Sequence, residues 1–438
     1  MLQTLKNAFL TPEIRKKLIY TLIILLIYRL GCFVPIPGLN LSDTFGSTTN
    51  SDFMGMLSMI TGGSLQNGTI FALGIIPFIN SFIIMQLLTL IIPKLEKLSK
   101  EGEDGKKKIN QYTRYMAILL GIIQAIGVML SWKNSITGVF GATDGVSKIF
   151  TMICVVIILT GGSALVMWLG ERITEFGIGN GTSLIIFVGI VSSLGTSIGT
   201  SIFSTIPDQA KNGDLTGIWF LLGFIVLVIL LFGLIVFVDL SERRIPVQYA
   251  KQIKGNKMYG GQSTHIPIKV NSGGVMPIIF ASSLIMFPQM IMQFVGKTNG
   301  FTDFWYTWMG VGGHLYPLFM FLLIIFFAYF YAQIQFNPDD IARMIQQNGG
   351  FIPGIRPGKS TSDHLRKINN RITLFGALFL AFVSLIPTYI LKLKGFESLG
   401  LNNAFSATGL LIVVSVALEF EKQLESQLLV KNNKGFLK

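Results

Sequence analysis

The basic residues of this chain are concentrated in alternate loops between long apolar runs. No lysine or arginine occurs between Leu30 and Pro93, whereas seven occur between Lys94 and Arg114. Positive residues are retained on the cytoplasmic side when a polytopic membrane protein inserts. The alternation therefore predicts a chain that crosses a membrane several times, and it sets the orientation of that chain.

The composition agrees with a membrane-embedded chain. Of the 438 residues, 51% are hydrophobic and 13% are charged, whereas a soluble domain has about 25% charged residues. A helix needs roughly 20 apolar residues to cross the hydrocarbon. The sequence predicts ten such helices, near residues 18–35, 75–92, 115–132, 149–169, 183–204, 217–238, 275–295, 315–335, 372–391 and 403–420.

The distribution of charge predicts where the termini lie. An even number of spans places both termini on one side of the membrane. The termini and the four loops on that side hold 28 of the 35 lysine and arginine residues, and the five opposite loops hold six. We therefore expect both termini in the cytoplasm.

Two cytoplasmic loops, residues 239–272 and 336–371, are unusually long and basic. Loops of this length are uncommon unless they are functional. Apolar residues among the charges of Val247–Val270 predict an ordered hairpin, and Pro338 predicts the start of a helix in the second loop. Such a basic surface attracts anionic lipid or an acidic partner such as RNA. Topology and lipid attraction explain the charge of most basic loops, but for these two long loops the sequence does not place them ahead of a docking surface.

A short apolar segment on the opposite side cannot cross the membrane. Phe53–Ile60 has only eight residues and lies within the long segment Pro37–Thr69, which has no basic residue. Non-helical backbone at membrane depth is tolerated where it is buried in protein or lines water. We therefore expect this segment to fold back into a cavity of the protein.

The ten spans divide into two sets of five, and an odd number per set makes the two halves run in opposite directions. This arrangement permits an inverted repeat with a working site between the halves, marked by broken helices in corresponding positions. Glycine and proline interrupt the second span and the seventh span, namely Gly74, Pro77, Gly273, Gly274, Pro277 and Pro288.

The residues for catalysis are missing from the predicted spans. None of the three histidines, His265, His314 and His364, lies inside a span, and no aspartate pair does. We therefore expect neither an enzyme nor a metal or cofactor site. Arg29 is the only lysine or arginine inside a span, and a lone arginine there costs about 2.5–3.5 kcal/mol. It must pair with backbone carbonyls, polar side chains or a partner subunit.

Several motifs resemble the SecY family, the channel subunits of the bacterial protein translocase. They run in order along the whole chain, at Tyr28–Gly31, Pro35–Gly38, Ala72–Pro77, Trp168–Glu171, Gly177–Gly181, Gln262–Asn271, Gly274–Ser283 and Phe351–Gly358. The resemblance implies an all-α protein of ten transmembrane helices in two inverted, pseudo-symmetric halves, 1–205 and 206–438. It also implies a bacterial plasma membrane location.

The resemblance further implies a pore that is closed by an aliphatic waist and by a short plug helix over about residues 52–64. The waist residues would be Ile79, Ile83, Ile186, Ile279 and Ile412. The apolar plug residues would be Phe53, Met54, Met56, Leu57, Met59 and Ile60. Thr182 stands near the waist where relatives often have isoleucine, which leaves the contribution of the fifth span open.

Function and partners are implied in the same way. Unfolded polypeptide would pass the waist, and membrane segments would leave through a lateral gate between the second and third spans and the seventh and eighth spans. The long loops would dock the SecA motor ATPase or the ribosome and its RNA through Arg243, Arg244, Lys251 and Arg356. Signal peptides, nascent chains, the lipid bilayer and two small subunits, SecE and SecG, would be the other partners.

Two other functions remain compatible with ten apolar spans. A secondary transporter for a small solute would need a polar site at mid-membrane, for which the chain offers Asn80, Ser81, Gln86 and Gln124. A structural scaffold would need only the apolar surfaces. The apolar midplane favours a polypeptide conduit, because an aliphatic constriction blocks water and ions by dewetting.

Overall fold

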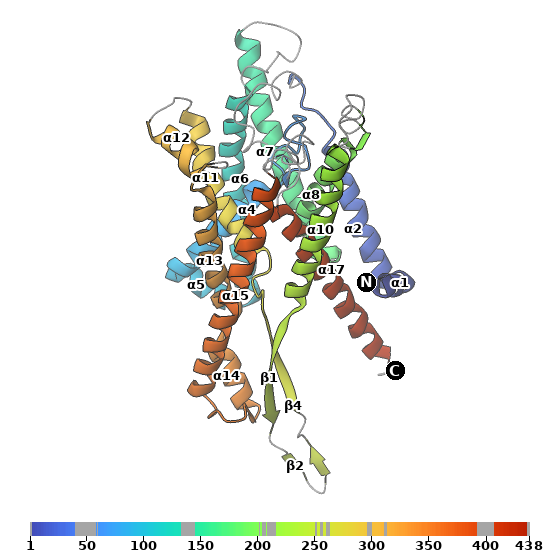
Figure 1. Cartoon of the computed structure of the whole chain (residues 1–438), viewed down its shortest axis with the longest axis vertical. Coiled ribbons are helices and arrows are strands. Elements are labelled where there is room, and N and C mark those ends of the chain that lie inside the picture. Colours follow the sequence, from blue (N-terminus) through green and yellow to red (C-terminus); the bar gives the residue numbers. More distant parts are fainter. Residues whose placement is uncertain are drawn as a thin grey trace.

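The computed structural model describes residues 2–39, 58, 60–132, 145–200, 202–203, 207, 216–249, 252–254, 257–259, 263–295, 300–310, 313–391 and 407–435. It is a mostly helical molecule in which long helices run roughly parallel to the longest axis (Figure 1). The helices of the first half of the chain are α1 Leu2–Leu10, α2 Pro12–Gly31, α4 Ile76–Ile91, α5 Pro93–Lys100, α6 Glu103–Ser131, α7 Gly145–Phe176 and α8 Gly181–Thr200.

The helices of the second half are α10 Thr216–Leu240, α11 Met276–Val295, α12 Gly300–Phe304, α13 Tyr316–Gln335, α14 Pro338–Gln347, α15 Lys359–Leu391 and α17 Ala407–Gly435. A π-helical turn, Trp305–Met309, follows α12. The strands are β1 Glu242–Tyr249, β2 Gln252–Lys254, β3 Lys257–Tyr259, β4 Ser263–Lys269 and β5 Gly350–Phe351.

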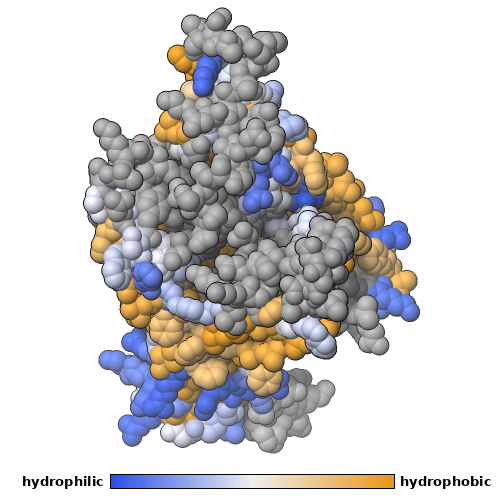
Figure 2. Space-filling model, turned by 45° about the horizontal axis from the view of Figure 1, so that its top comes forward, coloured by the Kyte–Doolittle hydropathy of each residue, from blue (hydrophilic) through white to orange (hydrophobic). Residues whose placement is uncertain are grey.

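Among the described residues, six helices are long and apolar enough to cross a membrane. They lie in α6, α7, α8, α10, α13 and α15, and a seventh span results if α4 and α5, which are bent by 101° relative to each other, are taken as one. The other predicted spans fall on α2, on α11 and, for its described part, on α17. On the face that Figure 2 shows, hydrophobic side chains form a band across the lower part of the body, and hydrophilic ones gather below that band.

Two apolar clusters fill most of the helical body. One is built mainly by α10, α11, α13, α15 and α17, around Phe224, Ile278, Phe280, Ile324 and Leu411. The other is built mainly by α2, α7 and α8, with additional members from α17 and with Ile279 of α11 packed against it. Side chains on the outer faces of the same helices, such as Val226 and Ile229 of α10, are more than half exposed in the isolated chain. Such faces suit a hydrocarbon solvent, where apolar exposure has no cost.

The first long loop forms the hairpin that the sequence predicts. β1 and β4 pair antiparallel with Ile245 opposite Ile266, and the short strands β2 and β3 pair beyond them. Ile245 and Val247 are buried while their neighbours are exposed, which is the alternation of a half-buried strand. The hairpin projects below the helices in Figure 1, and it begins at Glu242, earlier than predicted, because β1 follows α10 almost directly.

The second long loop folds onto the first. β5 adds to the edge of β1, with Gly350 opposite Tyr249. An apolar cluster joins both loops, with Ile245, Val247 and Ile268 from the hairpin and Ile345, Ile352 and Leu365 from the second loop and α15. The two loops therefore form one module, which the sequence does not predict.

Both described ends of the chain lie on the same side of the body. α1 packs against α2 and α17 through the small cluster of Ala8, Ile14, Leu18, Ile178 and Leu424. In Figure 1 these ends lie in the lower half, which also carries the hairpin. The two described ends therefore lie beside each other, on the side of the body that carries the hairpin (Figure 1).

Candidate functional site

The five isoleucines predicted to line a waist come from four different helices. Ile79 and Ile83 lie on α4, and Ile186, Ile279 and Ile412 lie on α8, α11 and α17. Ile83, Ile186 and Ile412 are at most 7% exposed, and the other two are half-buried.

These isoleucines converge inside the molecule. Ile186 and Ile412 belong to one apolar cluster, against which Ile79 and Ile279 pack. Ile83 belongs to the neighbouring cluster, and Ile79 packs against that cluster as well. Helices separated by more than three hundred residues of sequence, such as α4 and α17, thus bring aliphatic side chains to one place. Thr182 instead donates a hydrogen bond from its hydroxyl to Oδ1 of Asn180 at 2.6 Å, at the start of α8.

The predicted plug is described only at its end. Phe53, Met54, Met56, Leu57 and Met59 lie outside the described residues. Ile60 is half-buried and packs against the cluster that contains Ile186 and Ile412. Its carbonyl oxygen approaches α8 so closely that a Cβ on Gly189 would lie 2.7 Å from it. Only glycine at this position allows the segment to lie against α8.

Arg29 finds a partner in the segment that follows. Its Nη1 donates to the carbonyl oxygen of Gly62 at 3.3 Å, and its guanidinium lies 5.5 Å from the ring centroid of Phe33. Gly62 has φ +66°, a left-handed conformation that glycine adopts without strain. Of the partner types expected from the sequence, the structure shows a backbone carbonyl.

The helices predicted to form a lateral gate are neighbours. α4 packs on α6, α11 packs on α13, and α11 contacts both α4 and α6. Two buried amides lie on the first pair, Asn80 on α4 and Gln124 on α6, and neither has a hydrogen-bond partner among the described residues. Ser81 donates to the carbonyl oxygen of Thr113 at 2.7 Å, which ties α4 to α6.

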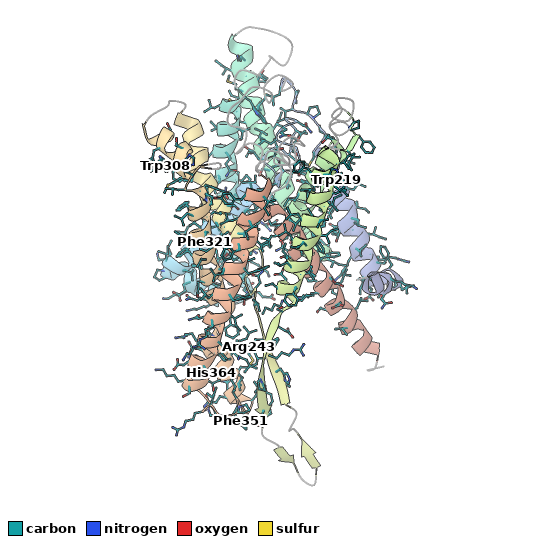
Figure 3. The ribbon with its side chains drawn as sticks, viewed as in Figure 1. Trp219, Arg243, Trp308, Phe321, Phe351 and His364 are labelled. Carbon is teal, nitrogen blue, oxygen red and sulfur yellow. The ribbon has the colours of Figure 1, made fainter. Side chains whose placement is uncertain are left out.

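The predicted docking residues lie on the module made by the two loops. Arg243 and Arg244 are exposed on β1, and Arg244 also pairs with Glu242 at 2.8 Å. Arg356 is exposed in the turn between β5 and α15. Lys251 lies outside the described residues. Figure 3 shows Arg243 and Phe351, a residue of β5, at the same lower end of the molecule.

The turn that carries Arg356 is fixed from both sides. The hydroxyl of Thr361 donates to the carbonyl oxygen of Arg356 at 2.9 Å. Gly354 and Gly358, which flank the arginine, have φ of +82° and +97°, so both positions favour glycine. The side chain of Arg356 is therefore presented from an ordered turn.

A second contact ties α14 to α15 beside that turn. Asp339 accepts hydrogen bonds from the hydroxyl of Ser362 and from Nη2 of Arg366, the latter at 3.0 Å. The hydrogen bond from Ser362 holds the pKa of the Asp339 carboxyl below its usual value, and Arg366 and Arg343 add to the effect. The sequence signals only the start of α14, where Asn337 caps the helix by accepting from the Asp339 amide.

Comparison with known proteins identifies the family. A family model described as SecY matches residues 69–421. The protein translocase subunit SecY of Streptomyces galbus is 43% identical over 452 residues, and that of Mycobacterium tuberculosis is 41% identical over 458 residues. Each comparison covers 100% of both chains.

The chain belongs to the SecY family. This confirms the resemblance that the motifs of the loops indicate.

Solved structures share the fold of this SecY-family chain. One described as a protein conducting channel superposes with a TM-score of 0.65 at 19% identity, covering 94% of this chain and 91% of the other. Sec61 in the canine ribosome-channel complex from the endoplasmic reticulum gives a TM-score of 0.62 at 18% identity, with the same coverage. The agreement extends over nearly the entire chain, so the arrangement of helices is that of the family.

Proposed function

We propose that this chain is the central subunit of a protein-conducting channel. It moves unfolded secretory polypeptides across the bacterial plasma membrane and releases membrane segments sideways into the bilayer. The observation that carries the proposal is the convergence of Ile79, Ile186, Ile279 and Ile412 from four helices on one apolar cluster, with Ile60 against it. An apolar constriction of this kind excludes water and ions, and it can widen around a threaded chain when the helices part.

The proposed architecture has ten spans in two inverted halves, residues 1–205 and 206–438, with both termini in the cytoplasm. The two large clusters support it, because each is built mainly by the helices of one half and they meet at the waist helices. Tryptophans gather at membrane interfaces. The exposed Trp219 and Trp308 lie toward the end opposite Arg243 in Figure 3, which supports this placement of the membrane.

The proposed plug spans about residues 52–64 and closes the channel from the outer side of the waist. Its support comes from the described end of the segment. Ile60 packs on the waist cluster, while Gly189 and Arg29 hold the backbone that follows. Displacing the plug would expose the waist to the outer solution.

The proposed docking surface is the module of the two cytoplasmic loops, with Arg243, Arg244, Lys251 and Arg356. A ribosome or the SecA motor ATPase would bind there and supply the energy for movement. A solved relative is described in a ribosome-channel complex, and the basic character of the module suits RNA or an acidic protein face. The small subunits SecE and SecG would cover part of the exposed apolar faces of the helices.

Site-specific cross-linking tests the conduit directly. A photoreactive residue at Ile279 should label a stalled secretory precursor, because this side chain belongs to the proposed waist. The same probe at Ile229, on the outer face of α10 and 65% exposed, is the matched control and should label lipid instead. Two results would show that the waist does not line the route of the polypeptide. One is equal labelling of the precursor from both positions, and the other is no labelling from Ile279 while the precursor is stalled in the channel.

A further inference from the structure

A buried polar contact joins three elements at the base of the cytoplasmic hairpin. Asp239, near the end of α10, accepts a hydrogen bond on Oδ1 from Nδ2 of Asn271 at 2.7 Å and another on Oδ2 from the hydroxyl of Ser415 at 2.5 Å. Asn271 lies between β4 and α11, and Ser415 lies on α17. One carboxylate therefore connects α10, the segment leading into α11, and α17.

The surroundings make this contact specific. Asn271 and Ser415 are each only 9% exposed, and Asp239 is half-buried. An ionised carboxylate only accepts hydrogen bonds, so both donors point at it. Hydrogen bonds to a charged group in a partly buried site are stronger than those between neutral groups. The contact therefore resists separation of the three elements.

The backbone leaves little slack between the hairpin and the helices. Only Ser241 separates α10 from β1, and its carbonyl oxygen accepts from the amide of Val270 at 3.1 Å, which closes the base of the hairpin. On the other side, a Cβ on Gly376 of α15 would lie 2.4 Å from the carbonyl oxygen of Val270. The base of the hairpin is thus held between α15 and the contact made by Asp239.

This contact lies between two regions that the proposed function assigns to different tasks. The hairpin beyond it carries Arg243 and Arg244 of the docking surface. The helix that follows Asn271 is α11, and Ile279 of the waist lies in its first turn. A displacement of the hairpin must therefore either break the contact or move the start of α11.

We propose that Asp239 is a positioning residue that couples docking on the hairpin to opening of the channel through Asn271 and α11. The inference rests on the proposed function, since it needs the hairpin to dock a partner and α11 to line the waist. Coupling of this kind is a free energy shared by two sites. Removing Asp239 should weaken that coupling while leaving each site intact.

The test uses the complete translocase in proteoliposomes with four variants. They are Asp239→Ala, Asp239→Asn, Asn271→Asp and the exchange D239N/N271D, which restores an amide and a carboxylate facing each other. Glu242→Gln is the matched control, because Glu242 is a carboxylate at the same base that, like Asp239, lies within electrostatic range of Lys422, but whose ion pair is with the neighbouring Arg244. The readouts are the affinity of the SecA motor for the vesicles, motor-driven translocation, and the ion conductance opened by a synthetic signal peptide without motor.

Asp239→Ala should keep the affinity of the motor and the conductance opened by the signal peptide, and lower motor-driven translocation by roughly 5-fold to 150-fold, the usual range for coupling between sites. Asp239→Asn and Asn271→Asp should each lose part of the activity. The exchange D239N/N271D should recover most of it, and Glu242→Gln should behave as the wild type.

Three results would overturn the proposal. Loss of motor affinity in Asp239→Ala would make Asp239 part of the docking surface, and loss of the signal-peptide conductance would give it a purely structural role. Failure of the exchange D239N/N271D to recover translocation, with normal amounts of inserted protein, would exclude the contact with Asn271. Measurements on the wild type test the proposed function independently of the variants. If the chain were not a protein-conducting channel, the wild type would neither bind the motor nor translocate a precursor.

Discussion

Replacing Ile83 and Ile186 with asparagine should hydrate the waist and let ions leak through the resting channel. The two side chains are 6% and 5% exposed and come from α4 and α8. A buried amide without a hydrogen-bond partner costs roughly 1–3 kcal/mol. Water that enters the constriction removes this cost, so each asparagine favours the hydrated waist over the dry one by about that amount.

The expected size of the leak follows from these values. One asparagine shifts the ratio of hydrated to dry waist by about 5-fold to 150-fold, because 1.36 kcal/mol corresponds to a factor of ten. Two asparagines together contribute about 2–6 kcal/mol, which corresponds to a factor of roughly 30 to 2 × 10⁴. As long as the waist of the wild type is dry most of the time, the resting conductance of the variant should exceed that of the wild type by the same factor.

Single-channel recording in planar bilayers, without motor or precursor, measures this conductance. Ile83→Leu with Ile186→Leu keeps the side chains apolar and should show no leak. Ile324→Asn places the same amide at a fully buried position on α13, outside the waist helices, and controls for general disturbance of packing. A double asparagine variant that inserts and exports normally without a rise in current would refute the waist, and so would an equal leak from Ile324→Asn.

Two further predictions concern the module of the two long loops. Arg356→Glu should lower motor-driven export by about tenfold or more, because a reversed charge at an interface repels the partner. The amount of the variant inserted in the membrane should not change. Arg371 is also exposed, and the control variant Arg371→Glu should export normally. The pKa of Asp339 is lower in the folded chain than in the unfolded chain. Its carboxylate therefore stabilises the contact of α14 with α15 at full strength when the pH is above the unfolded-state pKa of about 3.9. This stabilisation is lost as the pH falls through the lower pKa of the folded state. Hydrogen exchange of α14 should therefore be faster in Asp339→Asn than in the wild type at pH 7, and equal in the two below that range. A difference that is independent of pH, or an equal effect of Asp363→Asn at an exposed position of α15, would contradict this account.

Much of the fold follows from patterns that lie along the chain. Runs of about 20 apolar residues are long enough to cross the hydrocarbon, and they predict the positions of the long helices in the structure. The hairpin in the first long loop and the start of α14 at Pro338 also follow from local signals. The motifs of the loops identify the family, because they are short, ordered and specific.

The contacts of the candidate site depend on residues far apart in the sequence. Arg29 reaches the carbonyl of Gly62, 33 residues away, and Ser415 reaches Asp239 across 176 residues. The pairing of Gly350 with Tyr249 merges two loops that the sequence presents as separate. Nothing in the local pattern marks these partners, since a lone arginine or aspartate predicts only that some partner exists.

Hydropathy and charge act on each segment independently, because insertion depends on the apolar length of a helix and on the lysines and arginines beside it. For this reason the sequence by itself determined which segments are long and apolar enough to cross a membrane and which loops are basic. It did not determine which faces of the helices meet, because an isoleucine facing lipid and one facing another helix are equally apolar. Only the tertiary structure decided that Ile79, Ile186, Ile279 and Ile412 share one cluster, because close packing of side chains selects among helix faces that are chemically alike.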